Sequence, residues 1–217
     1  MNPIRILMNE MMMPFLQFSY DSIYPNYAFG IILLTLMVKL ILFPLTKKQF
    51  ESMKQMQVLQ PKFTEIRNKH KSNPQKLQEE MMKLYKKHNV NPLSGCLPMI
   101  VQLPFLLALF YTMSSDAFNE LIYQNDGFPG LTSFWLPDLS QPDHLLILPL
   151  LIAGLTYWSQ KYMSPNVSNP QQKAIMTFLP IFMIFICLKM PGGVLLYWAA
   201  SQLISTIQQI AIMKKNA

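Results

Sequence analysis

The chain has 217 residues, of which 51% are hydrophobic and only 13% are charged, and its formal net charge is +7. Soluble domains carry about 25% charged residues, so this composition excludes an ordinary soluble protein. The two cysteines, Cys96 and Cys187, are predicted at opposite membrane surfaces, and we therefore expect both to be free thiols.

The first twenty residues carry apolar side chains at helical spacing, interrupted by Arg5, Glu10 and Pro14. This pattern predicts an amphipathic helix that lies in the membrane interface, within an extracytoplasmic segment over residues 1–26. A disordered tail is the alternative that the pattern leaves open. The apolar positions are Ile4, Leu7, Met8, Met11, Met12 and Phe15.

Five apolar stretches follow, and each predicts a transmembrane helix. The hydrocarbon core of a bilayer needs about 20 apolar residues as a helix, and only helices or closed barrels satisfy their backbone there. None of the stretches shows the alternation of barrel strands. The fold class is therefore predicted as an all-α integral membrane protein. The five spans are residues 27–45, 97–113, 145–162, 174–188 and 194–213.

The basic residues predict the orientation of these spans. Eleven of the eighteen Lys and Arg residues lie between Lys47 and Lys87, and cytoplasmic connections carry an excess of such residues. Residues 46–96, 163–173 and 214–217 are therefore predicted to be cytoplasmic, and residues 114–144 and 189–193 extracytoplasmic. This places the N-terminus outside and the C-terminus in the cytoplasm.

The long connection 46–96 predicts a cytoplasmic helical hairpin. Apolar residues recur every three or four positions on both sides of a break at Ser72-Asn73-Pro74, and proline suits the first position of a helix. We expect Pro61 to kink the first of the two helices. The positive charge of the hairpin fits anionic lipid headgroups, ribosomal RNA or a role in orientation alone. No aromatic interleaving indicates base reading, so we expect no DNA partner.

Polar residues inside the spans predict a shared hydrophilic groove. Lys39 lies in the first span, where a charge costs about 2.5–3.5 kcal/mol, and Thr35 lies one turn before it on the same face. Gln102 lies in the second span, and the fifth span carries a broad polar face that includes Ser201 and Gln202. Two alternatives stay open: Lys39 snorkels to the cytoplasmic surface, or the polar groups only bridge helices.

The motifs of common enzymes are missing from the sequence. It contains no phosphate-binding Gly-x-x-x-x-Gly-Lys-Ser/Thr loop, and His70, His88 and His144 have no metal-ligand spacing. Every acidic residue lies outside the predicted spans, which disfavours a proton or cation pump. We therefore expect no enzyme, no cofactor and no metal.

Several motifs recur in a fixed order along the chain and together indicate a known family. They are Val38-Lys39-Leu40 with Phe43-Pro44-Leu45-Thr46-Lys47; Leu59-Gln60-Pro61-Lys62; Asn91-Pro92-Leu93-Ser94-Gly95-Cys96-Leu97-Pro98 with Gln102-Leu103-Pro104; and Met190-Pro191-Gly192-Gly193 with Leu196-Tyr197-Trp198. In this order they resemble the YidC/Oxa/Alb family of membrane protein insertases. The resemblance covers roughly residues 20 to 214.

The resemblance implies five core helices around a groove that is open to the cytoplasm and to lipid but closed outward. It implies a positive residue in this groove, which is usually arginine and here is Lys39. By the same resemblance, Thr35, Gln102, Tyr197, Trp198, Ser201 and Gln202 line the groove or contact substrate. The family's cytoplasmic hairpin is implicated in substrate capture, and we assign this role here to Met53, Met56, Met81 and Met82.

The predicted function is therefore a membrane protein insertase and chaperone. It would move short polar tails of nascent membrane proteins through the groove and release their hydrophobic segments into lipid, without nucleotide hydrolysis. An assembly chaperone without insertase activity and a small-solute channel or transporter are the alternatives. Expected partners are nascent membrane proteins and anionic lipids, with the Sec translocon and the ribosome as further candidates. We expect a monomer in the bacterial plasma membrane.

Overall fold

The structure is a computed structural model, and within the residues that it describes all regular structure is helical. The all-α fold class is thus confirmed. The described residues are 6–71, 73–88, 90, 97–116, 118, 135–136, 138–163 and 170–215. The helices are η1 (a π-helix, Leu7–Met12), α2 (Met13–Ser22), α3 (Tyr27–Ile41), α4 (Phe43–Lys69), α5 (Pro74–Lys87), α6 (Leu97–Met113), α8 (Ile147–Met163), α9 (Pro170–Cys187) and α10 (Gly192–Lys215).

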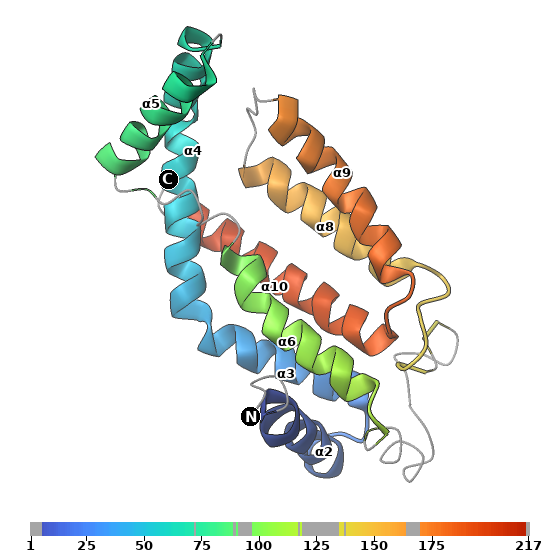
Figure 1. Cartoon of the computed structure of the whole chain (residues 1–217). Helices are drawn as coiled ribbons and strands as arrows, with labels where there is room; N and C mark the ends of the chain where they lie inside the picture. The colour runs from blue at the N-terminus through green and yellow to red at the C-terminus, as the bar shows by residue number, and fades with distance from the viewer. Residues whose placement is uncertain are drawn as a thin grey trace.

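Helix α10 lies at the centre of the bundle. It packs against α3, α6 and α8, and its C-terminal part packs against α4. Helices α8 and α9 run side by side as a pair, and α2 packs on α3 at the edge of the bundle. Helices α4 and α5 form a hairpin that projects away from the other helices (Figure 1). Any site formed between α3, α6 and α10 is therefore built around one central helix.

A bend of 65° separates α3 from α4, and it falls before the predicted end of the first span at residue 45. Helix α3 ends at Ile41, because Pro44 has no N–H to continue the backbone ladder and its ring clashes with a preceding carbonyl. Proline is instead accommodated in the first turn of α4. Pro61 lies inside α4, which is one continuous helix from Phe43 to Lys69, and the kink expected at Pro61 remains a prediction.

The described helices differ in whether their length and apolar composition suit a membrane span. By length and apolar composition no one of them qualifies as a span alone, whereas α3 and α4 qualify together across their bend. The apolar parts of α6 and α9 are shorter, at Ile100–Met113 and Met176–Cys187. The five predicted spans, which coincide with α3, α6, α8, α9 and α10, remain a prediction.

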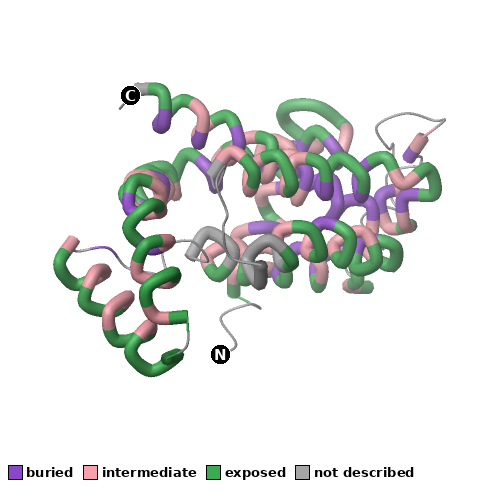
Figure 2. Tube along the Cα trace, turned by 90° about the horizontal axis from the view of Figure 1, so that it is seen from above, coloured by how far each residue is buried: buried purple, intermediate pink, exposed green. Residues whose placement is uncertain are grey.

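Burial is concentrated between the helices of the bundle, while the hairpin is mostly exposed (Figure 2). One apolar core joins η1, α2, α3, α6 and α10. Large apolar side chains also cover the outer faces, with Leu40 of α3 71% exposed and Phe185 of α9 66% exposed. Exposed side chains of this kind suit contact with lipid.

The N-terminal segment is helical over Leu7–Ser22, so the alternative of a disordered tail is wrong for these residues. Met12 and Leu16 are buried in the core, whereas Phe18 and Tyr24 are exposed. Ile4 lies outside the described residues. The placement of this helix in a membrane interface remains a prediction.

Candidate functional site

The ammonium group of Lys39 lies inside the bundle, with only 9% of the residue exposed. Its Nζ donates to the hydroxyl oxygen of Ser205 at 2.8 Å and to the amide oxygen of Gln102 at 3.3 Å. The first contact is short and the second is at the long end of the range for N–H···O bonds. Lys39 therefore points toward α6 and α10, and in this structure it does not extend to the surface as snorkelling would require.

The side-chain amide of Gln102 joins the polar groups of three helices. Its oxygen accepts from Lys39 of α3 and from the hydroxyl of Ser201 of α10, at 3.3 and 3.2 Å. Its nitrogen donates to the hydroxyl oxygen of Tyr197 at 2.6 Å. We call Lys39, Gln102, Tyr197, Ser201 and Ser205 the polar cluster.

Helix α10 supplies three members of the polar cluster from one face. Tyr197, Ser201 and Ser205 are spaced four residues apart, which places them one above the other along a helix. Tyr197 and Ser201 are buried, whereas Ser205 is half-buried. Within the polar cluster, the α10 residues near the start of the helix are thus buried, whereas Ser205, further along α10, is partly exposed.

The other predicted groove residues lie near the polar cluster but are not joined to it by the hydrogen bonds above. Thr35 is fully buried, and its hydroxyl donates to the carbonyl of Ile31 in its own helix at 2.7 Å. Trp198 is half-buried and packs against the apolar core. Gln202 is half-buried beside Ser201. The structure therefore brings together Lys39, Gln102, Tyr197 and Ser201 from the predicted set.

Ser205 was absent from the predicted groove residues, although it makes the shortest contact to Lys39. Its position was visible in the sequence as the third residue of the four-residue spacing Tyr197, Ser201, Ser205. A single sequence does not show how α3 and α10 are aligned along their axes. This alignment decides which serine of α10 contacts the ammonium group of Lys39.

No carboxylate pairs with Lys39 among the residues that the structure describes. The ion pairs found there join Lys47 to Glu51, and Lys83 to Glu79 and Glu80, all on the hairpin. A buried charge with only neutral partners is costly. The polar cluster thus holds one positive charge without an internal counter-ion, which makes it attractive to an anionic group.

A second polar contact joins α8 to α10 further along the bundle. The amide oxygen of Gln209 accepts from the hydroxyl of Ser159 at 2.7 Å, and its nitrogen approaches the carbonyl of Ser159 at 3.4 Å. At the end of α10, Lys54 of α4 donates to the carbonyl of Met213 at 3.2 Å. These contacts tie α8 and the base of the hairpin to the central helix.

The hairpin has a small apolar core of its own. Leu59, Phe63 and Val90 are buried there, and the rings of Phe63 and Tyr85 lie 4.9 Å apart. Burial raises the pKa of the Tyr85 phenol. The predicted capture residues Met56 and Met81 pack against this core, Met53 is half-buried, and Met82 is 45% exposed.

Of the two cysteines, Cys187 lies among the described residues. Cys187 is a buried free thiol, as expected, whereas Cys96 and most of the motif Asn91 to Pro98 lie outside the described residues. The residues that carry the remaining motifs, including Met190-Pro191-Gly192-Gly193, are described.

An all-helical bundle with apolar side chains on its outer faces and a buried lysine among polar groups is typical of an α-helical membrane protein. Residues 18–217 match the model of the 60Kd inner membrane protein family. The chain belongs to this family, which places it in the bacterial inner membrane.

Proteins called membrane protein insertase YidC are similar to this chain. The one from Fusobacterium nucleatum is 42% identical over 203 residues, which cover 94% of both chains. The one from Magnetococcus marinus is 42% identical over 196 residues, which cover 90% of this chain and 34% of the relative. This chain therefore spans about a third of the second relative's length and nearly all of the first.

A solved structure has the same fold. It is described as an active YidC insertase crystal structure with the first transmembrane domain resolved. It superposes with a TM-score of 0.71 at 26% sequence identity, and the match covers 91% of this chain and 44% of that chain.

Proposed function

We propose that this chain is a membrane protein insertase and chaperone that accepts the polar tail of a nascent membrane protein at the polar cluster and passes its apolar segment into lipid. The single observation that carries the proposal is the buried ammonium group of Lys39, held by the neutral side chains of Ser205 and Gln102. The names of the relatives, membrane protein insertase YidC, agree with it.

The ammonium group of Lys39 can attract the acidic tail of a substrate. A lysine ammonium has three N–H groups, and Ser205 and Gln102 engage two of them. The third has no partner among the described residues and can bind an acidic residue in the tail of a substrate. Inside a low-dielectric bundle, such a pair attracts far more strongly than it would in water. An acidic tail would therefore be drawn to the cluster, and a basic tail would be repelled.

The neutral members of the cluster lower the cost of bringing polar atoms into the membrane. A peptide group that leaves water without a new hydrogen bond loses several kcal/mol. The hydroxyl groups of Ser201, Ser205 and Tyr197 and the amide of Gln102 can replace those lost bonds. We propose that these residues, with Thr35, Trp198 and Gln202, line a hydrophilic groove between α3, α6 and α10.

The release step needs no nucleotide. Apolar surface that moves from water into lipid gains roughly 25 cal/mol per Å², which is ample for a segment of twenty residues. The short apolar parts of α6 and α9 would thin the bilayer locally and so shorten the crossing. We propose that the substrate segment leaves along the exposed apolar faces of these two helices.

The hairpin would act first in this sequence of events. Its basic surface fits a position at the cytoplasmic face, with the N-terminus of the chain outside and the C-terminus inside. Met82 is exposed and Met53 is half-buried, and methionine adapts to varied apolar partners. We propose that these residues, with Met56 and Met81, hold the apolar segment before it enters lipid. The Sec translocon, the ribosome and anionic lipids are further proposed partners, and we propose that a monomer suffices.

The test is insertion of a single-span model protein with an acidic tail into liposomes that contain only this purified chain. We expect insertion without nucleotide. Lys39→Arg should retain it, because the charge is kept, and Lys39→Glu should reduce it by about tenfold or more, since it replaces attraction by repulsion. Equal insertion by both variants and the original chain would refute the electrostatic step. Solute flux without insertion would favour a channel, and improved folding of a partner without insertion would favour an assembly chaperone.

A further inference from the structure

Tyr197 is the least exposed member of the polar cluster. The residue is 0% exposed and belongs to the apolar core that joins α3, α6 and α10, whereas Gln102 is half-buried. The hydroxyl oxygen of Tyr197 accepts a hydrogen bond from Nε2 of Gln102 at 2.6 Å. This short contact therefore connects the polar cluster to a ring that is fixed in the apolar core.

The partners of Gln102 decide which way its side-chain amide points. A lysine ammonium group carries donors only, so the amide oxygen must face Lys39. The hydroxyl of Ser201 donates to the same oxygen, and the two contacts are 3.3 and 3.2 Å long. The NH₂ group consequently points away from Lys39, and the oxygen of Tyr197 is the acceptor that it meets there.

Removal of the Tyr197 hydroxyl would disturb Lys39 through this amide. A buried N–H group without an acceptor is costly, so the amide of Gln102 would turn to find another partner for its NH₂ group. The contact from Lys39 to the amide oxygen, at 3.3 Å, is already at the long end of the range for such bonds. A small movement of the amide would break it and leave Lys39 bonded to Ser205 alone.

We propose that Tyr197 is a positioning residue, which holds the amide of Gln102 in place and thereby fixes the direction in which Lys39 presents its ammonium group to a substrate tail. This role rests on the proposed function and requires no contact between Tyr197 and the substrate. A tyrosine suits it because its ring is held by the apolar core. The long side chains of Lys39 and Gln102 lose much more rotamer freedom when they are ordered.

The first measurement observes the amide of Gln102 directly. It uses nuclear magnetic resonance of the ¹⁵N-labelled full chain in lipid nanodiscs, and the signals missing from Gln102→Leu identify the side-chain NH₂ group. In the original chain, one of its two protons should lie downfield of the other and exchange slowly with water, because it is bonded to Tyr197. In Tyr197→Phe, which keeps the ring, this proton should move upfield and exchange about two- to tenfold faster, the scale of one neutral hydrogen bond.

The second measurement asks whether Tyr197 acts on substrate selection through Gln102. Insertion of acidic-tailed and neutral-tailed single-span proteins is compared in liposomes. Tyr197→Phe should lower the ratio of acidic-tailed to neutral-tailed insertion about two- to tenfold. The same substitution in a Gln102→Leu chain should leave the ratio unchanged, because the amide through which Tyr197 acts is gone. Such non-additivity is the signature of two coupled residues.

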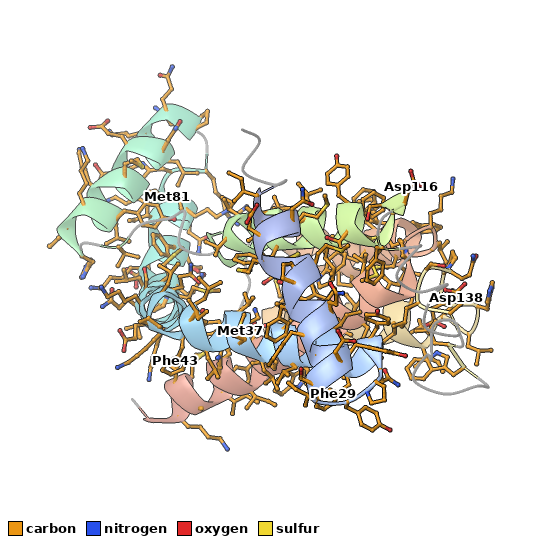
Figure 3. All side chains as sticks on the ribbon, turned by 90° about the horizontal axis from the view of Figure 1, so that it is seen from below. Phe29, Met37, Phe43, Met81, Asp116 and Asp138 are labelled. Carbon is orange, nitrogen blue, oxygen red and sulfur yellow. The ribbon has the colours of Figure 1, made fainter. Side chains whose placement is uncertain are left out.

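Tyr27→Phe is the matched control. It removes the hydroxyl of another buried tyrosine, 1% exposed, which lies at the start of α3, whereas Lys39 lies in the last turn of that helix. Figure 3 labels Phe29 and Met37 near these two ends of α3. The control variant should keep both the signals of the Gln102 amide and the preference for acidic tails.

Two results would overturn the proposal. One is an equal loss of tail preference from Tyr197→Phe with and without Gln102, and the other is a Gln102 amide whose signals do not respond to Tyr197→Phe. If Tyr197→Phe does not fold, equal and fast exchange of the two Gln102 protons in the original chain would overturn it instead. An original chain without any tail preference would refute the proposed function, and the amide signals would then still decide whether Tyr197 positions Gln102.

Discussion

The ammonium nitrogen of Lys39 lies 2.8 Å from the hydroxyl oxygen of Ser205, 166 residues further along the chain. This contact joins α3 to α10 at the half-buried part of the polar cluster. It fixes the position of the one positive charge that an incoming tail would meet. The effect of Lys39 should therefore depend on the serine as well as on the lysine.

Ser205→Ala should weaken the preference for acidic substrate tails. A hydrogen bond to a charged group contributes about 1.5–3 kcal/mol, so we expect a loss of roughly tenfold in insertion of an acidic-tailed substrate relative to a neutral-tailed one. Ser205→Thr keeps the hydroxyl and should retain the preference. Ser159→Ala removes a serine hydroxyl that bonds Gln209 rather than Lys39 and serves as the matched control. An equal loss of insertion for the acidic-tailed and the neutral-tailed substrate would show that Ser205 only supports folding.

Gln102→Glu should be more harmful than Gln102→Leu for acidic-tailed substrates. The glutamate would place a carboxylate beside the Lys39 ammonium, at a site where the amide oxygen now lies 3.3 Å away. Lys39 would then be neutralised by an internal partner. The leucine removes the shared hydrogen bonds but leaves the charge. Insertion assays that compare acidic and neutral tails measure the difference, and a glutamate variant that keeps its full preference would contradict this account.

The Ser159–Gln209 contact should stabilise the packing of α8 on α10 by a small amount. Hydrogen bonds between transmembrane helices average about 0.6 kcal/mol in double-mutant cycles. We expect a coupling free energy of that size between Ser159→Ala and Gln209→Ala, measured by unfolding in mixed micelles. A coupling near zero would mean that the 2.7 Å contact adds no net stability.

Gly193→Ala and Gly154→Ala should have opposite effects on stability. A Cβ at Gly193 would meet the sulfur of Met113 at 3.0 Å and a methyl carbon of Ile31 at 3.2 Å, and overpacking a core costs about 1–3 kcal/mol. At Gly154 nothing lies within 4 Å of the added carbon, so alanine should stabilise α8 by about 0.5–1 kcal/mol. Thermal unfolding of the two variants tests this, and equal shifts would be inconsistent with the packing described above.

The hairpin should loosen at alkaline pH because of Tyr85. Burial raises the pKa of its phenol above the ordinary value of 10.0, so the folded hairpin disfavours the ionised form. The resulting stability is complete below pH 10 and falls as the pH rises through the folded-state pKa. Hydrogen exchange of α5 amides, corrected for the intrinsic pH effect, should show the loosening in the original chain and a weaker one in Tyr85→Phe. An identical pH dependence of hydrogen exchange in the original chain and in Tyr85→Phe would contradict this role of Tyr85.

The helices were largely predictable because their signals are local. Pro74 and the Asn73 cap define the start of α5, and the apolar stretches coincide with α3, α6, α8, α9 and α10. The bend at Leu42 was missed because the apolar run continues through Phe43 and Leu45. The effect of Pro44 on the backbone ladder, rather than hydropathy, ends α3 there.

The site was predictable in its composition but not in its contacts. Lys39, Gln102 and Ser201 stood out as polar residues in apolar stretches, and the structure joins them. Thr35 shares the face of Lys39, yet its hydroxyl satisfies the backbone of its own helix, as threonine in a helix often does.

Reversing the charge at residue 39 shows whether that charge selects the substrate tail. Insertion of a single-span protein is measured in liposomes for acidic and basic tails, with the original chain and with Lys39→Glu. We expect the original chain to favour the acidic tail and Lys39→Glu to favour the basic one, since the sign of one buried charge sets the preference. The same preference in both chains, in variants that remain folded, would contradict it.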